Sequence, residues 1–129
     1  MVSLPSPAFP VDAESDAATA PLIAADVTRG VCRMLLRHET VAMAEVPLGD
    51  GRRADLMALN VRGEIVIVEV KVRVEDFRAD RKWREYLPYC DRFYFAVPEG
   101  FPARLVPGDC GLIVADGYGG AIRRAATTV

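Results

Sequence analysis

A chain of 129 residues with 51% apolar side chains is long enough for one domain with a hydrophobic core. Its formal net charge is -2, and residues 28–129 carry 16 basic and 14 acidic side chains, so charge alone does not indicate a nucleic-acid-binding surface. His38 is the only histidine and the three cysteines form no CxxC pair, which argues against a zinc centre. No apolar run approaches the roughly 18 residues of a membrane span, which argues against a membrane protein.

The N-terminal segment is rich in Pro, Ala and Ser and lacks a basic start. We therefore expect a flexible tail over residues 1–20 and a single domain over residues 21–125. Pro21 suits the first turn of a helix, and apolar side chains follow it at helical spacing. This pattern predicts a helix from Pro21 to about His38.

Bulky and β-branched segments between turn signals predict five strands, over residues 41–48, 54–61, 64–72, 92–98 and 111–116. Residues 74–90 have helical character, with Trp83 and Tyr86 on the inner face. The segment YGGAIRRA after Gly117 is expected to pair back on the last strand. The order α, β, β, β, α, β with a short further strand predicts an α/β fold, in which helices flank a mixed central sheet.

Glu69 and Lys71 are unexpected at the end of the third predicted strand, which begins with four bulky residues, Ile65 to Val68. Residues two apart in a strand point to the same face, so Glu69 and Lys71 share a face with Ile65 and Ile67. A strand end that reaches solvent and carries a surface ion pair would explain this. A functional site is the alternative, because burying these charges without a ligand is costly.

The turn between the second and third strands decides which residue lies opposite Glu69. A three-residue loop over residues 61–63, with the glycine in the left-handed conformation, would pair Asn60 with Glu64. The same register places Asp55 directly opposite Glu69, on the same face. A two-residue loop would instead turn the two acids to opposite faces.

Two carboxylates directly opposite each other repel unless a cation lies between them. Carboxylate and carbonyl oxygens are ligands that suit Mg²⁺ or Mn²⁺. We therefore expect Asp55, Glu69 and the backbone carbonyl of Val70 to hold one such ion. Lys71 would then orient an attacking water or stabilise negative charge on a phosphate, which makes Asp55, Glu69 and Lys71 the candidate catalytic residues.

An Asp at the start of one strand and Glu69-Val70-Lys71 at the end of the next resemble the PD-(D/E)xK nuclease superfamily, although Ala54 stands where its motif has proline. Four longer segments are similar to the MmcB family of bacterial DNA-repair proteins: RRADLMAL (52–59), EIVIVEVK (64–71), DFRADRKWREYLPYCDRFYFAVP (76–98) and GLIVAD (111–116). The resemblance spans about residues 22–118. It implies a restriction-endonuclease-like core, a role in DNA repair and DNA as partner, in the cytoplasm at the nucleoid.

Several further residues have two interpretations. Glu45 is an accessory metal ligand or, more commonly, a solvated strand acid. Arg78 and Lys82 on the second helix contact phosphate, with Lys82 also a candidate accessory catalytic residue, or they form a solvated helical face with neighbouring acids. Arg52 and Arg53 contact phosphate or are ordinary turn arginines.

Trp83 and Tyr86 could stack on a nucleic-acid base, but their helical spacing favours the core.

The leading interpretation is a DNA-repair protein with a metal-dependent endonuclease-like site that hydrolyses phosphodiesters. The alternative is a non-catalytic nuclease-fold module that binds DNA or a repair partner, and a metal-binding scaffold is a third. Because a duplex has two strands, many nucleases of this type act as homodimers.

Overall fold

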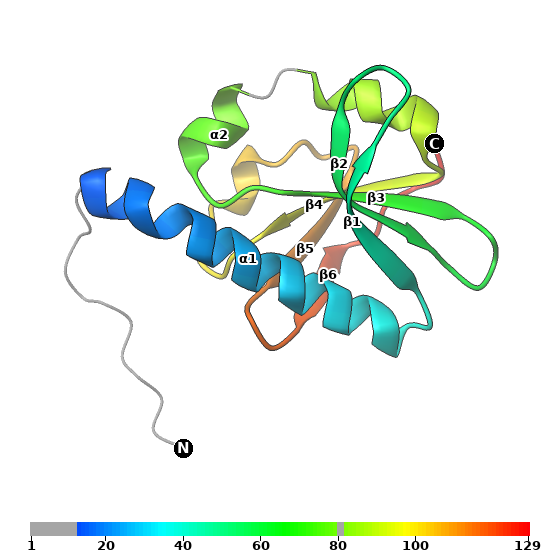
Figure 1. Ribbon diagram of the computed structural model, residues 1–129, viewed down its shortest axis with the longest axis horizontal. Helices are drawn as coiled ribbons and strands as arrows, with labels where there is room; N and C mark the ends of the chain where they lie inside the picture. The colour runs from blue at the N-terminus through cyan, green and yellow to red at the C-terminus, as the bar shows by residue number, and fades with distance from the viewer. Residues whose placement is uncertain (1–12, 80–81) are drawn as a thin grey trace.

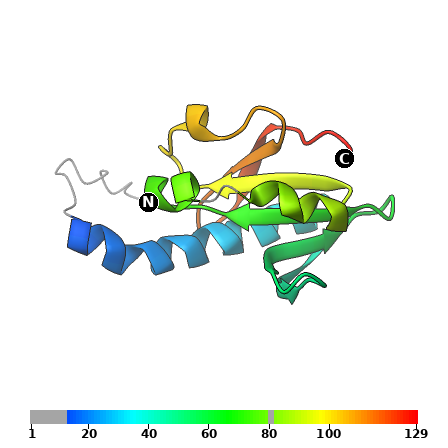
Figure 2. The same ribbon diagram turned by 90° about the horizontal axis from the view of Figure 1, so that it is seen from above.

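The computed structural model describes residues 13–79 and 82–129, which form a six-stranded mixed sheet with helices on both faces (Figures 1 and 2). The strands are β1 (Val41–Pro47), β2 (Arg53–Leu59), β3 (Ile65–Val70), β4 (Arg92–Val97), β5 (Gly111–Ala115) and β6 (Gly120–Arg124). They lie in the order of the chain, and only the pairs β3/β4 and β4/β5 are parallel. The helices are α1 (Ala13–Arg37), α2 (Val74–Ala79) and the 3₁₀ helices η1 (Trp83–Tyr89) and η2 (Ala103–Leu105).

The predicted order of elements and the mixed sheet are confirmed, including the return of β6 onto β5. The predicted start of the first helix at Pro21 is wrong: α1 begins at Ala13, so residues 13–20 of the predicted tail are helical. The alanines before Pro21 have the highest helix propensity, and the helix continues through the proline. Ala20, next to the proline, is already buried.

A single helix over residues 74–90 is also wrong, because α2 ends at Ala79 and a separate 3₁₀ helix begins at Trp83. Pro88 lies within this 3₁₀ helix. Proline removes a backbone donor and disfavours the α conformation of the residue before it, so it opposes an α-helical end to this segment. None of the described helices combines the length and hydropathy that a membrane-spanning helix needs.

The two faces of the sheet support two separate cores. On one face, α1 places Val27, Val31 and Met34 against β-strand residues such as Val68 and Ile113. Figure 2 shows α1 running along this face. The large side chains of the other face are mainly aromatic and come from α2, η1 and β4: Phe77, Trp83, Tyr86, Phe93 and Phe95.

Trp83 stacks on Phe93 with a centroid distance of 5.3 Å, and Phe93 meets Phe95 edge-on at 5.1 Å. Only 7% of Trp83 and 8% of Tyr86 are exposed, so the prediction that both belong to the core is confirmed. These contacts fix η1 against β4, next to the C-terminal end of β3.

The predicted register of the β2–β3 hairpin is confirmed. Leu59 is the partner of Ile65 and Leu56 the partner of Val68, and the Asn60 amide donates a hydrogen bond of 3.1 Å to the Glu64 carbonyl. Gly63 has a φ of +78°, the left-handed conformation that the three-residue loop requires.

We expect the Gly63→Ala variant to lose about 1 kcal/mol of unfolding free energy, because a side chain is disfavoured in the left-handed conformation. Urea denaturation would measure it. Gly108→Ala is the matched control, since Gly108 has no positive φ and open space around it. If both variants were equally stable, the loop would not hold the register in the way described.

Candidate active site

Strands β2 and β3 separate at the positions of Asp55 and Glu69, directly after the last paired residues, Leu56 and Val68. The Asp55 amide donates a hydrogen bond of 2.7 Å to Oε2 of Glu69, and the Val70 amide donates one of 2.8 Å to Oδ2 of Asp55. Side-chain carboxylates therefore accept backbone hydrogen bonds where the ladder ends. This exchange brings both acids into the gap between the strands.

The other edge of β2 is also irregular at this point. Glu45 of β1 lies between the pairs that join Ala44 to Leu56 and Val46 to Ala54, so it stands across from Asp55. It has a φ of +54°, which is uncommon for a residue with a side chain and costs roughly 1–2 kcal/mol. Such conformations cluster at functional sites, so the strain marks this end of the sheet as a candidate site.

All three candidate catalytic residues line one hollow of about 500 Å³ at the C-terminal end of β3. Asp55 and Val70 also line a second hollow of about 590 Å³ on the α1 face, where Glu45 and Arg29 border it. The gap between β2 and β3 is thus bordered by hollows on both faces of the sheet. The first hollow is lined by Arg53, Asp55, Glu69, Val70, Lys71, Asp76 and Tyr86.

Glu69 is the buried acid of this group, with only 4% of its surface exposed. Burial and then the negative charge of Asp55 raise the pKa of Glu69 to about 7, against the opposing effects of the Asp55 amide, the Tyr86 hydroxyl and Lys71. In the absence of a cation, the site therefore disfavours two ionised carboxylates.

Tyr86 lines the hollow with the acids, although its helical spacing favoured the core over base stacking. Its ring stacks on Phe93 at 5.8 Å, and its hydroxyl donates a hydrogen bond of 3.5 Å to the Arg53 carbonyl. The same hydroxyl lies near enough to the Glu69 carboxylate to oppose the rise of its pKa. Burial, followed by the charge of Glu69, raises the pKa of Tyr86. The signal that could have found it is chemical: a tyrosine on an inner helical face needs a partner for its hydroxyl.

Arg52 and Arg53 are placed differently. The Arg52 guanidinium lies 2.9 Å from Glu85 and 3.5 Å from Asp50, and its Cζ is 5.7 Å from the Tyr86 ring centroid. The Arg53 side chain is 65% exposed, with Glu45 at 3.5 Å, and it borders the hollow. Of the two, Arg53 is therefore better placed to meet a phosphate at the acids.

The remaining candidates lie at the margins of the site. Glu45 borders the hollow on the α1 face together with Asp55, and its side chain is 74% exposed. Lys82 is exposed and does not line the hollow that contains Lys71. The side chain of Arg78 lies outside the described part of the structure. Asp76 of α2 also lines this hollow.

The residues present fit a hard divalent cation. Among the described residues, no three Asp, Glu, His or Cys side chains gather as a metal cluster, so an ion would depend on two carboxylates, a backbone carbonyl and water. That is the usual manner of Mg²⁺, which keeps several of its waters. A carboxylate has about four lone-pair sites. A hydrogen bond from one backbone N–H to one of its oxygens therefore leaves lone pairs that can bind an ion.

Comparisons with known proteins give a family and a related solved structure. A family model described as DNA repair protein MmcB-like matches residues 12–129. Among solved structures, the SPO1766 protein of unknown function from Silicibacter pomeroyi is 44% identical, with a TM-score of 0.76 over 80% of this chain and 70% of that chain. No curated protein matches the chain.

Proposed function

We propose that this chain, which belongs to the MmcB-like family of DNA repair proteins, acts on DNA through a metal-dependent nuclease-type site at Asp55, Glu69 and Lys71. The family membership confirms the resemblance predicted from the sequence. The observation on which the proposal rests is that two acids and a lysine line one hollow, at a place where the backbone ladder ends.

The restriction-endonuclease-like core is part of the same proposal. The element order, the antiparallel β1–β2–β3 meander and the parallel β3/β4 pair support it. The position of the acids supports it as well, since both lie at the end of the β2–β3 pair next to the crossover through α2 and η1.

Each residue has a distinct role in the proposed reaction. Asp55 and Glu69, with the Val70 carbonyl, would hold Mg²⁺ or Mn²⁺, which when bound polarises the phosphate and acidifies a water. Lys71 would orient the attacking water and stabilise negative charge on the phosphate oxygens. The water oxygen would bond to phosphorus and release a proton to solvent, while the bond to the leaving sugar oxygen breaks in line and that oxygen takes up a proton. Tyr86 would hold Glu69 in place through its hydroxyl.

Single-turnover cleavage of mismatched, branched and single-stranded DNA tests the proposal. With excess protein, we expect one of these substrates to be cut in Mg²⁺ and none in EDTA. Asp55→Asn is the matched control. Asparagine keeps the shape of the side chain, and its amide oxygen can still accept the hydrogen bond from the Val70 backbone N–H. Cutting by wild type that never exceeds this control would contradict the enzymatic form of the proposal.

The second candidate is a nuclease fold kept for binding DNA or a repair partner without catalysis. The observation that favours it is that both acids already accept backbone hydrogen bonds, so they can serve the fold alone. This candidate predicts that cells carrying Lys71→Ala survive DNA damage as well as wild type. Sensitivity equal to that of a deletion would favour the enzyme instead.

A further inference from the structure

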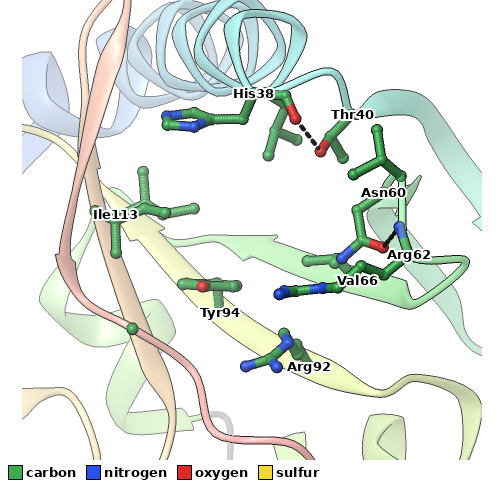
Figure 3. A pocket seen from close by; sticks show the side chains of 12 residues that line it. His38, Thr40, Asn60, Arg62, Val66, Arg92, Tyr94 and Ile113 are labelled. Atoms are coloured by element: carbon green, nitrogen blue, oxygen red, sulfur yellow. Dashed lines mark hydrogen bonds between the residues drawn. The ribbon is translucent and has the colours of Figure 1, made fainter.

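A third hollow, of about 380 Å³, lies on the α1 face at the other end of the sheet (Figure 3). It opens where α1 ends at Arg37 and the chain turns through His38 to Thr40. The β2–β3 hairpin and β6 complete its walls. Its lining residue Asn60 directly follows β2 and lies five residues from Asp55, about 17 Å at 3.3–3.4 Å per residue, so the hollow is separate from the acids.

The floor of this hollow is apolar. Val66, Tyr94 and Ile113 come from three adjacent strands, and 5%, 8% and 0% of their surfaces are exposed. Leu35 and Ile122 border the floor from α1 and β6. Ligand pockets typically combine such a floor with a few polar groups and have volumes of about 300–1,000 Å³.

The charged side chains that line the hollow are the guanidinium groups of Arg62 and Arg92. Arg62, Arg92 and His38 line the hollow, and no Asp or Glu of the described residues does. Glu64 lies outside the lining and accepts contacts of 3.1 Å from both arginines. Arg92 also donates a hydrogen bond of 2.6 Å to the Ala126 carbonyl. The guanidinium groups are thus oriented before any ligand arrives, which lowers the entropy cost of binding.

The Tyr94 hydroxyl is an unused polar group in this hollow. Only 8% of Tyr94 is exposed, and its hydroxyl is not among the fully buried polar atoms that lack a partner in the described residues, so this oxygen reaches the open space of the hollow. Figure 3 shows its oxygen pointing into the space between His38, Ile113 and Arg92. A hydroxyl at the edge of an apolar floor can donate to or accept from a polar atom of a ligand.

We propose that this hollow binds one nucleotide, with the base on the apolar floor and the phosphate at Arg62 and Arg92. Arginine is suited to both parts of such a ligand, because its planar guanidinium binds phosphate and stacks on rings. The nucleotide has two sources, a free mononucleotide or the 5′-phosphorylated end of a DNA strand. The proposal goes beyond the nuclease-type site and uses none of its residues.

Titration of the full chain in EDTA, followed by amide NMR shifts, tests this. We expect thymidine 5′-monophosphate to shift the amides of Val66, Tyr94 and Ile113 and to bind more tightly than thymidine or inorganic phosphate. Arg62→Gln, at a 69% exposed side chain, should weaken binding about tenfold through loss of a charge-assisted contact. Tyr94→Phe should weaken it about fivefold.

The controls separate this site from the acids. Arg33→Gln on the exposed surface of α1 and Asp55→Asn should both bind as wild type does. Saturation by the mononucleotide identifies the free ligand, and binding only of a 5′-phosphorylated oligonucleotide identifies the strand end. Equal affinity for thymidine, no effect of Arg62→Gln and Tyr94→Phe, or no binding of either probe would overturn the proposal, whatever the outcome of the cleavage assay.

Discussion

The Lys71→Met variant is expected to cut DNA about 10²- to 10³-fold more slowly than wild type in a single turnover with Mg²⁺, the usual loss when one preorganised donor is removed. Methionine keeps an unbranched apolar stem but has no ammonium group. The chain has one other lysine, Lys82, which is exposed, so Lys82→Met is the matched control and should lose far less.

Two further measurements separate a chemical role of Lys71 from a structural one. The variant should bind Mn²⁺ as wild type does, because Lys71 is not among the proposed ligands. It should also unfold at a similar denaturant concentration. Equal cleavage rates of Lys71→Met and wild type would remove Lys71 from the proposed mechanism, whereas a loss of ion binding or of stability would assign it to the structure.

The stability of the wild-type protein in EDTA is expected to fall as the pH rises from about 4.5 to about 7, the ordinary and folded values of the Glu69 pKa. A raised carboxyl pKa means that the folded state binds more protons than the unfolded state in this window, so its stability decreases with pH and then becomes constant. This rise in the Glu69 pKa corresponds to about 3 kcal/mol of unfolding free energy, at about 1.36 kcal/mol per pKa unit.

Glu69→Gln should remove this component, because an amide does not titrate. Its side-chain oxygen can still accept the bond from the Asp55 amide, so at pH 8 the variant is expected to be up to about 3 kcal/mol more stable than wild type. Urea denaturation across this pH range measures both proteins. Wild-type stability that rises between pH 4.5 and 7, with Glu69→Gln unchanged by comparison, would contradict the placement of Glu69 beside a second acid.

Added Mg²⁺ should reverse the difference between these two proteins. A cation shared by Asp55 and Glu69 stabilises the ionised pair and binds only the folded state, so wild type gains stability at pH 8 as the ion concentration increases. Glu69→Gln has one carboxylate fewer and should gain much less.

The hairpin register could be predicted because local sequence determines it. Gly63 is suited to the left-handed position and fixes a three-residue loop, and every pair along β2 and β3 follows from that loop. The face shared by Asp55 and Glu69 followed from the same argument. The buried aromatic side of η1 was also predictable, since Trp83 and Tyr86 have helical spacing.

Other features depend on competition that local patterns do not settle. The alanines before Pro21 favour a helix that includes them, whereas the proline favours a helix that starts there. The start of α1 at Ala13 therefore could not be predicted from the local sequence alone. The separation of β2 and β3 at Asp55 was also not predicted. A register derived from the loop extends the hydrogen-bonded pairing of the two strands without a break. At this point side-chain carboxylates accept the hydrogen bonds of the backbone N–H groups. Tyr86 comes near Glu69 only because η1 packs on β4.

Calorimetric titration with Mn²⁺ at pH 8 tests the shared cation most directly, using wild type, Asp55→Asn and Glu69→Gln. The account predicts one ion per wild-type chain and at least about tenfold weaker binding in each variant, since each removes one of two anionic ligands. Binding in both variants that equals wild type, or no binding by wild type at millimolar Mn²⁺, would contradict a cation held between the two acids.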